Sequence, residues 1–388
     1  MMKYITLNPI AQEGLNRLPA NYEKTEDLNE ADAVLVRSFS MLETEFSPNL
    51  KAIARAGAGV NNIPVDRCSE EGIVVFNTPG ANANGVAELC LLGLILASRD
   101  AKGGMAWVDA NKDDEALNKS MEKAKSKFAG TELKGKTLGV IGLGAIGVLV
   151  ANDAAALGMD VIGYDPYLSV GNALLLSRKI KLVTSLDDLY AASDYVTIHV
   201  PQTPDTKGTL CKAAFDKMKD GVAVLNFARD GLVVNDDLKE ALASGKVRKY
   251  VTDVPNYTVA NFDHVIAFPH LGASTEESET NCAVMASLEL TDFLENGNIT
   301  NSVNFPACTL GPAEKPERIC IAHRNVPSVI SSITTILGNA HANISDMVSK
   351  SRGDYAIALF DLDSVIDDSV KEELQALPDV LRVRVIKK

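Results

Sequence analysis

Short apolar runs alternate with longer helical segments along most of the chain. The runs end in small or polar residues, as strands of a buried sheet do. They lie at residues 3–7, 33–36, 50–54, 73–76, 137–141, 161–164, 195–200, 222–226, 249–253 and 265–267. Long apolar or amphipathic helices are expected at residues 83–98 and 274–296. Strands that alternate with helices predict parallel sheets with crossover connections, so we expect an α/β fold with two doubly wound, Rossmann-like domains.

The pattern changes after residue 306. Residues 307–317 (ACTLGPAEKPE) carry proline and glycine and read as a linker. Beyond it, residues 318–388 show the order strand, helix, strand, strand, helix, strand. This order predicts a small ferredoxin-like βαββαβ domain.

A glycine motif follows the strand expected at 137–141. Gly142, Gly144 and Gly147 have the G-x-G-x-x-G spacing, and Asp165 ends the next strand about twenty residues further on. The glycines permit a tight turn, close approach of a pyrophosphate and close packing of helix on strand. A carboxylate at the Asp165 position accepts hydrogen bonds from a ribose 2′-hydroxyl and repels a 2′-phosphate. The motif therefore predicts a dinucleotide site that favours NAD over NADP.

Length, charge and cysteine usage exclude several classes of protein. A chain of 388 residues suggests two or three domains, and its formal net charge of −13 argues against nucleic acid or an anionic membrane as the partner. The six cysteines are scattered without a C-x-x-C pair, which indicates neither a disulfide framework nor a zinc site. We expect no metal, no membrane span and a reduced, cytoplasmic setting.

Three polar residues at strand ends are candidates for chemistry. Hydride transfer from an alcohol needs a base for the hydroxyl proton and a cation for the developing carbonyl oxygen. Arg229 and His270 fit these roles, because each follows a strand in a loop that contains glycine. His199, which precedes a proline at another strand end, is expected to line the cofactor.

Several motifs together resemble the D-isomer-specific 2-hydroxyacid dehydrogenases. They are RAGAGVNNI, GLGAIG, HVPQTPDT, NFARDGLV and PHLGAST. The closer resemblance, which includes the GGMAWV insert and the C-terminal domain, is to short bacterial members with a C-terminal ACT domain. It implies NAD-dependent oxidation of D-3-phosphoglycerate to 3-phosphohydroxypyruvate, the first step of phosphorylated L-serine biosynthesis, by a homodimer or homotetramer.

The resemblance also implies roles for individual residues. Arg229 would bind the substrate carboxylate and carbonyl, and His270 would be the acid/base. Cofactor contacts, including the motif glycines, are expected at Gly142, Gly144, Ala145, Ile146, Gly147, Asp165, His199, Phe227, Ala228, Arg229, Asp253, His270, Gly272 and Ala273. Substrate contacts are expected at Arg37, Ser38, Gly59 and Val60, with Lys125 reaching a phosphate across a dimer interface.

The domain plan and the effector site follow from the same resemblance. We expect a discontinuous substrate domain at 1–97 and 282–310, an NAD domain at 98–281 and an ACT domain at 318–388. His323, Asn325 and Asn343 match positions that bind L-serine in related dehydrogenases. Ser328 stands where the family usually has glycine, and its side chain could crowd the effector. An inert dimerisation domain is the alternative to serine feedback.

One departure from the family pattern concerns the partner of His270. The family usually places a glutamate 29 residues after the catalytic arginine, and here that position is Thr258. Three alternatives are open: a nearby Asp or Glu replaces it, a neutral histidine suffices at alkaline pH, or activity is weak. If His270 lacks its partner, the reductive direction, which needs an imidazolium, should decline at lower pH than in relatives with the glutamate.

Two other functions compete with this prediction. One is a dehydrogenase for an unphosphorylated D-2-hydroxy acid such as glycerate or lactate. Phe39, where some relatives carry a second basic residue, supports it, whereas Arg37 and the expected ACT domain argue against it. The other is an NAD-responsive binding protein with weakened catalysis, which the presence of both Arg229 and His270 opposes.

Overall fold

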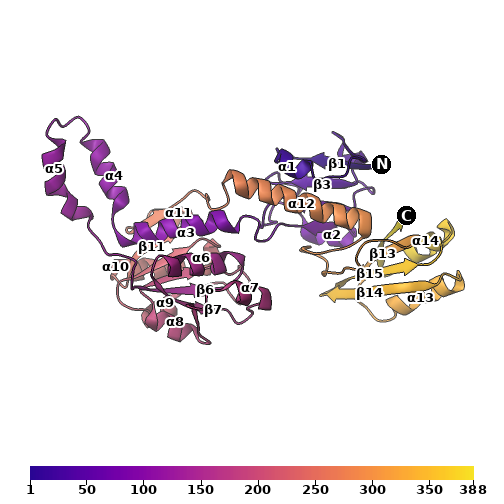
Figure 1. Cartoon of the computed structure of the whole chain (residues 1–388). Coiled ribbons are helices and arrows are strands. Elements are labelled where there is room, and N and C mark those ends of the chain that lie inside the picture. Colours follow the sequence, from indigo (N-terminus) through magenta and orange to yellow (C-terminus); the bar gives the residue numbers. More distant parts are fainter. The chain divides into compact units, whose positions relative to one another are not determined.

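The structure, a computed structural model, describes all residues from Met1 to Lys388. The chain forms two compact units, which we describe separately (Figure 1). Unit 1 contains Met1–Asn82 and Glu276–Lys388, and unit 2 contains Ala83–Thr275. The helix Ala83–Ser98 belongs to unit 2 as a compact body. The functional domain boundaries expected at 97/98 and 281/282 stay a prediction. No helix is long and apolar enough to cross a membrane.

Unit 2 is built on a seven-stranded parallel sheet with the order β12-β11-β10-β9-β6-β7-β8. The chain starts at β6 in the interior and winds outward in both directions, so the order reverses between β6 and β9. In open α/β sheets such a reversal creates a crevice at the carboxyl ends of the strands. The strands are β6 (Thr137–Ile141), β7 (Asp160–Tyr164), β8 (Lys181–Leu182), β9 (Tyr195–Ile198), β10 (Val222–Asn226), β11 (Val247–Thr252) and β12 (Val265–Ala267).

Helices cover both faces of this sheet. One core joins α3 and α6 to the sheet through residues such as Leu94 and Val150, and another joins α8, α9 and α10 through residues such as Phe215 and Leu238. The helices are α3 (Ala83–Ser98), α4 (Ala101–Ala110), α5 (Leu117–Ala124), α6 (Ala145–Ala156), α7 (Val170–Leu175), α8 (Leu186–Ala192), α9 (Lys212–Lys217), α10 (Asn235–Ala243) and α11 (Tyr257–Ala260). The sheet with helices on both faces confirms the predicted doubly wound domain.

Helices α4 and α5 and the 3₁₀ turn Lys125–Phe128 form a hairpin that projects from unit 2 (Figure 1). We call residues 101–128 the arm. Its exposed apolar side chains include Met105, Val108 and Met121.

Unit 1 begins with a five-stranded parallel sheet of order β2-β1-β3-β4-β5. This is the second predicted doubly wound sheet. Its strands are β1 (Met2–Thr6), β2 (Tyr22–Lys24), β3 (Ala33–Val36), β4 (Ala52–Arg55) and β5 (Val74–Phe76). Three helices pack with it: α1 (Gln12–Leu15), α2 (Val65–Glu70) and the long α12 (Glu276–Asn296). Gly14 is required where α1 crosses α12, because a Cβ there would overlap the backbone of Ala283.

The rest of unit 1 is the predicted βαββαβ domain. Its four strands form an antiparallel sheet of order β14-β15-β13-β16. The elements are β13 (Glu317–Arg324), α13 (Val329–Asn339), β14 (Ile344–Arg352), β15 (Tyr355–Leu362), α14 (Asp368–Gln375) and β16 (Val380–Lys387). The expected ferredoxin-like order is confirmed, as is the fold class of the whole chain.

The βαββαβ domain is joined to the rest of unit 1 by a shared core. One face of its sheet packs on α13 and α14 through Ile321 and Phe360. The other face contributes Cys320 and Leu359 to the core that contains Phe293 of α12. Apolar packing on both faces therefore stabilises the sheet of the βαββαβ domain.

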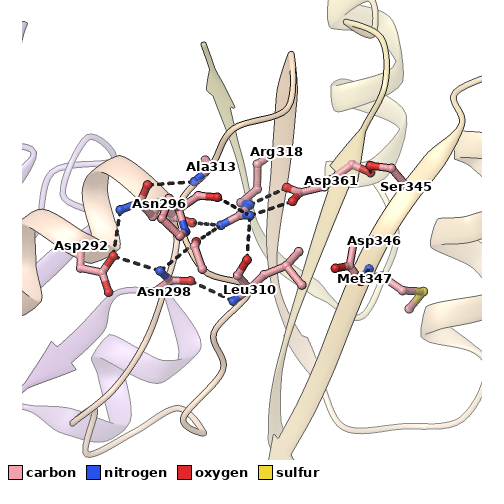
Figure 2. A network of polar contacts seen from close by, with 12 residues as sticks. Asp292, Asn296, Asn298, Leu310, Ala313, Arg318, Ser345, Asp346, Met347 and Asp361 are labelled. Atoms are coloured by element: carbon pink, nitrogen blue, oxygen red, sulfur yellow. Dashed lines mark hydrogen bonds and ion pairs between the residues drawn. The ribbon is translucent and has the colours of Figure 1, made fainter.

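A buried arginine connects the βαββαβ domain to the rest of unit 1 through hydrogen bonds (Figure 2). Arg318 on β13 is 0% exposed, and its Nε and Nη2 donate to the two carboxylate oxygens of Asp361 at 2.6 and 2.8 Å. Its Nη1 donates to the carbonyl oxygens of Asn296 at 2.9 Å and Gly311 at 2.7 Å. One guanidinium thus joins the end of α12, the linker and the sheet.

A buried carboxylate on α12 makes the stability of unit 1 sensitive to pH. Glu289 is 7% exposed, and its Oε1 accepts a hydrogen bond from Asn301 Nδ2 at 2.5 Å. Burial raises the pKa of Glu289 from 4.5 to about 7. Between these two values the folded chain binds more protons than the unfolded chain, so stability falls as the pH rises across this window.

Replacement of Glu289 by glutamine is expected to remove this dependence. The glutamine side chain would keep the shape and carry no charge, so E289Q should be more stable than the original above pH 7 by about 1–3 kcal/mol, since one pKa unit corresponds to about 1.4 kcal/mol. Below pH 4.5 the difference should vanish. Thermal melts on both sides of the window measure it, with the exposed Glu277→Gln as the control. An equal shift at both pH values would contradict the assignment.

Candidate functional site

The carboxyl ends of the strands of unit 2 bring the predicted cofactor residues to one edge of the sheet. All neighbouring strands are parallel, so their ends point the same way. The glycine turn follows β6, and Asp165, His199, Arg229, Asp253 and His270 follow β7, β9, β10, β11 and β12. The predicted clustering of these residues at one sheet edge therefore occurs in the structure.

The glycine turn leaves room for a ligand beside its backbone. Gly142 has φ of +88°, a left-handed value that glycine adopts without strain. A Cβ on Gly147 would overlap the carbonyl oxygen of Gly142, whereas a Cβ on Gly144 would meet nothing within 4 Å. Helix α6 starts at Ala145, so its unpaired N–H groups face the same opening. These features fit a dinucleotide pyrophosphate.

Asp165, which follows β7, forms a hydrogen bond with the backbone of the glycine turn. Its two carboxylate oxygens accept hydrogen bonds from the backbone N–H groups of Leu143 and Tyr167, each at 2.8 Å. Each oxygen retains a lone pair that a ribose hydroxyl could use. The position and charge of Asp165 fit NAD.

His199 lies beside the glycine turn as a neutral side chain. Burial lowers its pKa from 6.5 to about 4, so the ring is uncharged at physiological pH. One ring nitrogen, Nε2, lies 2.9 Å from Thr197 Oγ1, while the buried Nδ1 has no partner. Buried polar atoms are nearly always paired, so the orphaned Nδ1 is consistent with a ligand group at this point.

Arg229 projects from the loop after β10. Its side chain is exposed and its Nη1 donates to the carbonyl oxygen of Ala228 at 2.7 Å. The loop is fixed by Asn226, whose Nδ2 donates to the carbonyl oxygen of Arg229 at 2.8 Å and whose Oδ1 accepts from the N–H of Ala228. The guanidinium therefore extends from a fixed backbone and keeps free donors for an anionic ligand.

His270 occupies a strained position that a buried aspartate supports. It is exposed with φ of +54°, and the carboxylate of Asp253 accepts hydrogen bonds from the next two N–H groups, Leu271 and Gly272, at 2.7 Å each. Asp253 is 2% exposed, and burial raises its pKa above its ordinary value of 3.8, while the two N–H bonds and the charge of His270 oppose the rise. Asp253, expected as a cofactor contact, thus also shapes the His270 loop.

Thr258 lies on α11 with its side chain exposed. No glutamate occupies the position that the family usually gives it. The two oxygens of Asp253 accept the N–H groups of Leu271 and Gly272, and no hydrogen bond joins them to the His270 ring. The three alternatives from the sequence therefore stay open.

The substrate residues expected in unit 1 also follow parallel strands. Arg37 and Ser38 follow β3, and Gly59 and Val60 lie in the loop after β4. The carbonyl oxygen of Ala58 in that loop accepts a hydrogen bond from Asn77 Nδ2 at 2.6 Å. The structure brings these loops to one edge of the five-stranded sheet.

Two residues near Arg37 were missed by the sequence analysis. Asn8, after β1, accepts three backbone hydrogen bonds from residues 37–39 through its Oδ1. Glu279, in the first turn of α12, forms an ion pair with Arg37. The position of Asn8 directly after a strand was a usable signal, whereas the Glu279 pair depends on the packing of α12.

Lys125 lies on the arm, in the 3₁₀ turn after α5. Its side chain is 63% exposed and is paired with Glu122 on α5. Its expected role at a phosphate stays a prediction.

The three effector candidates lie at the ends of strands in the βαββαβ domain. His323 is 3% exposed, its Nδ1 donates to the carbonyl oxygen of Arg324 at 2.8 Å, and its buried Nε2 has no partner. Burial lowers the pKa of His323 below its ordinary 6.5. Asn325 Nδ2 donates to the carbonyl oxygen of Gly353 at 2.9 Å, and Asn343 Nδ2 donates to Asp363 at 2.5 Å.

Ser328 begins α13 with φ of +72°. This left-handed conformation costs a residue with a Cβ about 1–2 kcal/mol relative to glycine. The glycine that the family usually has here would take it freely. The serine therefore adopts this conformation at some cost, and it adds a side chain to the loop.

Comparison with known proteins agrees with this geometry. Residues 94–272 match the family model described as D-isomer specific 2-hydroxyacid dehydrogenase, NAD binding domain. A D-3-phosphoglycerate dehydrogenase from Archaeoglobus fulgidus is 35% identical over 328 residues, which cover 79% of this chain and 60% of the relative. The chain thus spans less than two thirds of that relative's length. A cofactor(NAD⁺)-bound 3-phosphoglycerate dehydrogenase from Entamoeba histolytica matches with a TM-score of 0.61 and 28% identity, over 78% of this chain and 98% of the other.

A longer match comes from D-3-phosphoglycerate dehydrogenase 1 of Saccharomyces cerevisiae. It is 30% identical over 383 residues, which cover 92% of this chain and 78% of the yeast protein. A match of this length must extend into the βαββαβ domain. The expected NAD-binding domain is confirmed, and the chain belongs to the D-isomer specific 2-hydroxyacid dehydrogenase family.

Proposed function

We propose that the chain catalyses NAD-dependent oxidation of D-3-phosphoglycerate to 3-phosphohydroxypyruvate, a first step toward L-serine. The observation that carries the proposal is the placement of the glycine turn, Arg229 and His270 on the carboxyl ends of one parallel sheet. Two observations support D-3-phosphoglycerate as the substrate. Relatives of this chain are named D-3-phosphoglycerate dehydrogenase, and Arg37 places a cation at the end of β3.

The proposed mechanism assigns one task to each side chain. Arg229 binds the carboxylate and the reacting C2 oxygen, whose negative charge grows as the hydroxyl loses its proton. The imidazole of His270 accepts that proton. The glycine turn and Asp165 would hold NAD, which would supply the acceptor for the hydride of C2. Asp253 holds the His270 loop through two N–H groups, and Arg37 and Ser38 bind the phosphate.

We also propose that the chain works as a homodimer or homotetramer. The arm projects from unit 2 (Figure 1). Its helices expose the apolar side chains of Met105, Val108 and Met121, and Met105 is 61% exposed. Exposed apolar side chains on a projecting hairpin are typical of a subunit interface. Lys125 on the same arm would then reach the phosphate of a second subunit.

L-serine is the proposed effector of the βαββαβ domain. The buried Nε2 of His323 has no partner, and Asn325 carries an amide in the loop that follows it. Asn343 carries its amide at the opposite end of the same sheet, just before β14. The side chain of Ser328 at the same loop favours the alternative of an inert dimerisation domain. Titration calorimetry with L-serine separates the two. The cytoplasmic setting expected from the cysteines stays a prediction.

Assay of NADH formation at alkaline pH tests the proposal. D-3-phosphoglycerate, D-glycerate and D-lactate are offered in parallel, with NAD and with NADP. The proposal predicts turnover that is selective for the phosphorylated acid and for NAD. Selective turnover of glycerate or lactate would favour the rival dehydrogenase, and tight NAD binding without turnover of any acid would favour the binding protein.

A further inference from the structure

The backbone around Arg37 is held at nearly every polar atom. Asn8 Oδ1 accepts hydrogen bonds from the N–H groups of Arg37 and Ser38 at 3.0 Å each and of Phe39 at 2.9 Å. The carbonyl oxygen of Arg37 accepts from Arg55 Nε at 3.0 Å and from Asn62 Nδ2 at 3.4 Å. The main chain of this loop therefore cannot shift without the loss of several hydrogen bonds. Only the side chain of Arg37 is available to change partners.

That side chain is engaged with a carboxylate. Arg37 Nη2 lies 2.6 Å from Glu279 Oε1, and the two side chains are 40% and 44% exposed. Half-exposed ion pairs contribute little to stability, because water screens them and two long side chains lose freedom. The pair is thus weak enough for a ligand anion to displace the carboxylate.

Arg55 adds a second cation to the neighbourhood. Its Nε donates to the carbonyl oxygen of Arg37 at 3.0 Å, so the two arginines are direct neighbours. Neutralisation of Glu279 would remove one negative charge from beside Arg37.

We propose that Glu279 is a specificity-determining residue that competes with the substrate's phosphate for Arg37. The inference rests on the proposed function. A phosphate dianion attracts the guanidinium more strongly than one carboxylate does, so it displaces Glu279. A substrate without the phosphate offers no anion at this point and leaves the Arg37–Glu279 pair intact. Glu279 therefore sets the affinity for phosphorylated acids and has no effect on unphosphorylated ones.

The variant Glu279→Gln tests the competition by a gain of affinity. It is nearly isosteric and lies in the first turn of a 21-residue helix, so it should fold. We expect KM for D-3-phosphoglycerate to fall about 2- to 5-fold, the range set by the weak free energy of an exposed pair. Both kcat and the KM for D-glycerate should stay unchanged. Glu276→Gln, in the same turn without an ion pair to Arg37, is the matched control and should change neither KM.

A double variant separates competition from other effects. In the Arg37→Met background, Glu279→Gln should have no further effect on KM for D-3-phosphoglycerate. A higher KM in the single variant would overturn the inference and show that Glu279 positions Arg37. An unchanged KM, or an equal fall for both acids, would overturn it as well. Failure of the original chain to oxidise D-3-phosphoglycerate would instead contradict the proposed function and the inference with it.

Discussion

Replacement of His270 by asparagine is expected to lower kcat for the oxidation by about 10²- to 10⁴-fold, the contribution typical of a general acid/base. Asparagine tolerates the left-handed backbone at this position, where φ is +54°, so the loop should keep its shape. KM for NAD should change much less than kcat, because the glycine turn and Asp165 are not touched by the substitution. Initial rates at saturating NAD measure the effect.

His264 offers a matched control for this substitution. It is also exposed, with φ of +66°, and it lies just before β12 as His270 lies just after it. His264→Asn should leave kcat unchanged. Equal losses in both variants would show that the loss reflects damage to the loop around β12, and a fully active His270→Asn would remove His270 from the mechanism.

Replacement of Arg318 by methionine is expected to lower the free energy of unfolding of unit 1 by about 3–5 kcal/mol. The loss of one partner leaves the buried carboxylate of Asp361 without its counter-ion, which is far more costly than the loss of an exposed pair. The carbonyl oxygens of Asn296 and Gly311 also lose their donor. Urea denaturation followed by circular dichroism measures the change.

Lys315→Met is the control for Arg318→Met. Lys315 lies on the same linker and pairs with Asp363, but the two side chains are 46% and 42% exposed. Removal of that pair should cost at most about 1 kcal/mol. If both variants lose equally little, the network of Figure 2 does not hold the linker on the βαββαβ domain.

Elements with a strong local signal could be predicted from the sequence. The helix Ala83–Ser98 and the strand Thr137–Ile141 match their expected bounds, because an apolar run ends at turn residues on both sides. The strands Tyr22–Lys24 and Lys181–Leu182 were not expected. Both are edge strands of three and two residues, so pairing with their neighbours determines them, and no apolar run marks them.

The sequence predicted which sheet edge carries the candidate site residues, but it predicted few of the hydrogen bonds and ion pairs that these residues form. Parallel strands bring Arg229 and His270 to one sheet edge, and the strand pattern alone implied this. The positive φ of His270 and the two hydrogen bonds from its loop to Asp253 depend on tertiary packing. The pair of Arg37 with Glu279 joins residues far apart in the sequence, and no local pattern connects them.

Transfer of deuterium from substrate to cofactor tests the central claim most directly. D-3-phosphoglycerate deuterated at C2 is incubated with the purified chain and NAD, and the NADH is examined by mass spectrometry. The proposed function predicts that the NADH carries the deuterium, and that the keto acid formed beside it does not. NADH without deuterium, or no NADH from this substrate, would contradict the claim that the chain removes hydride from C2 of D-3-phosphoglycerate.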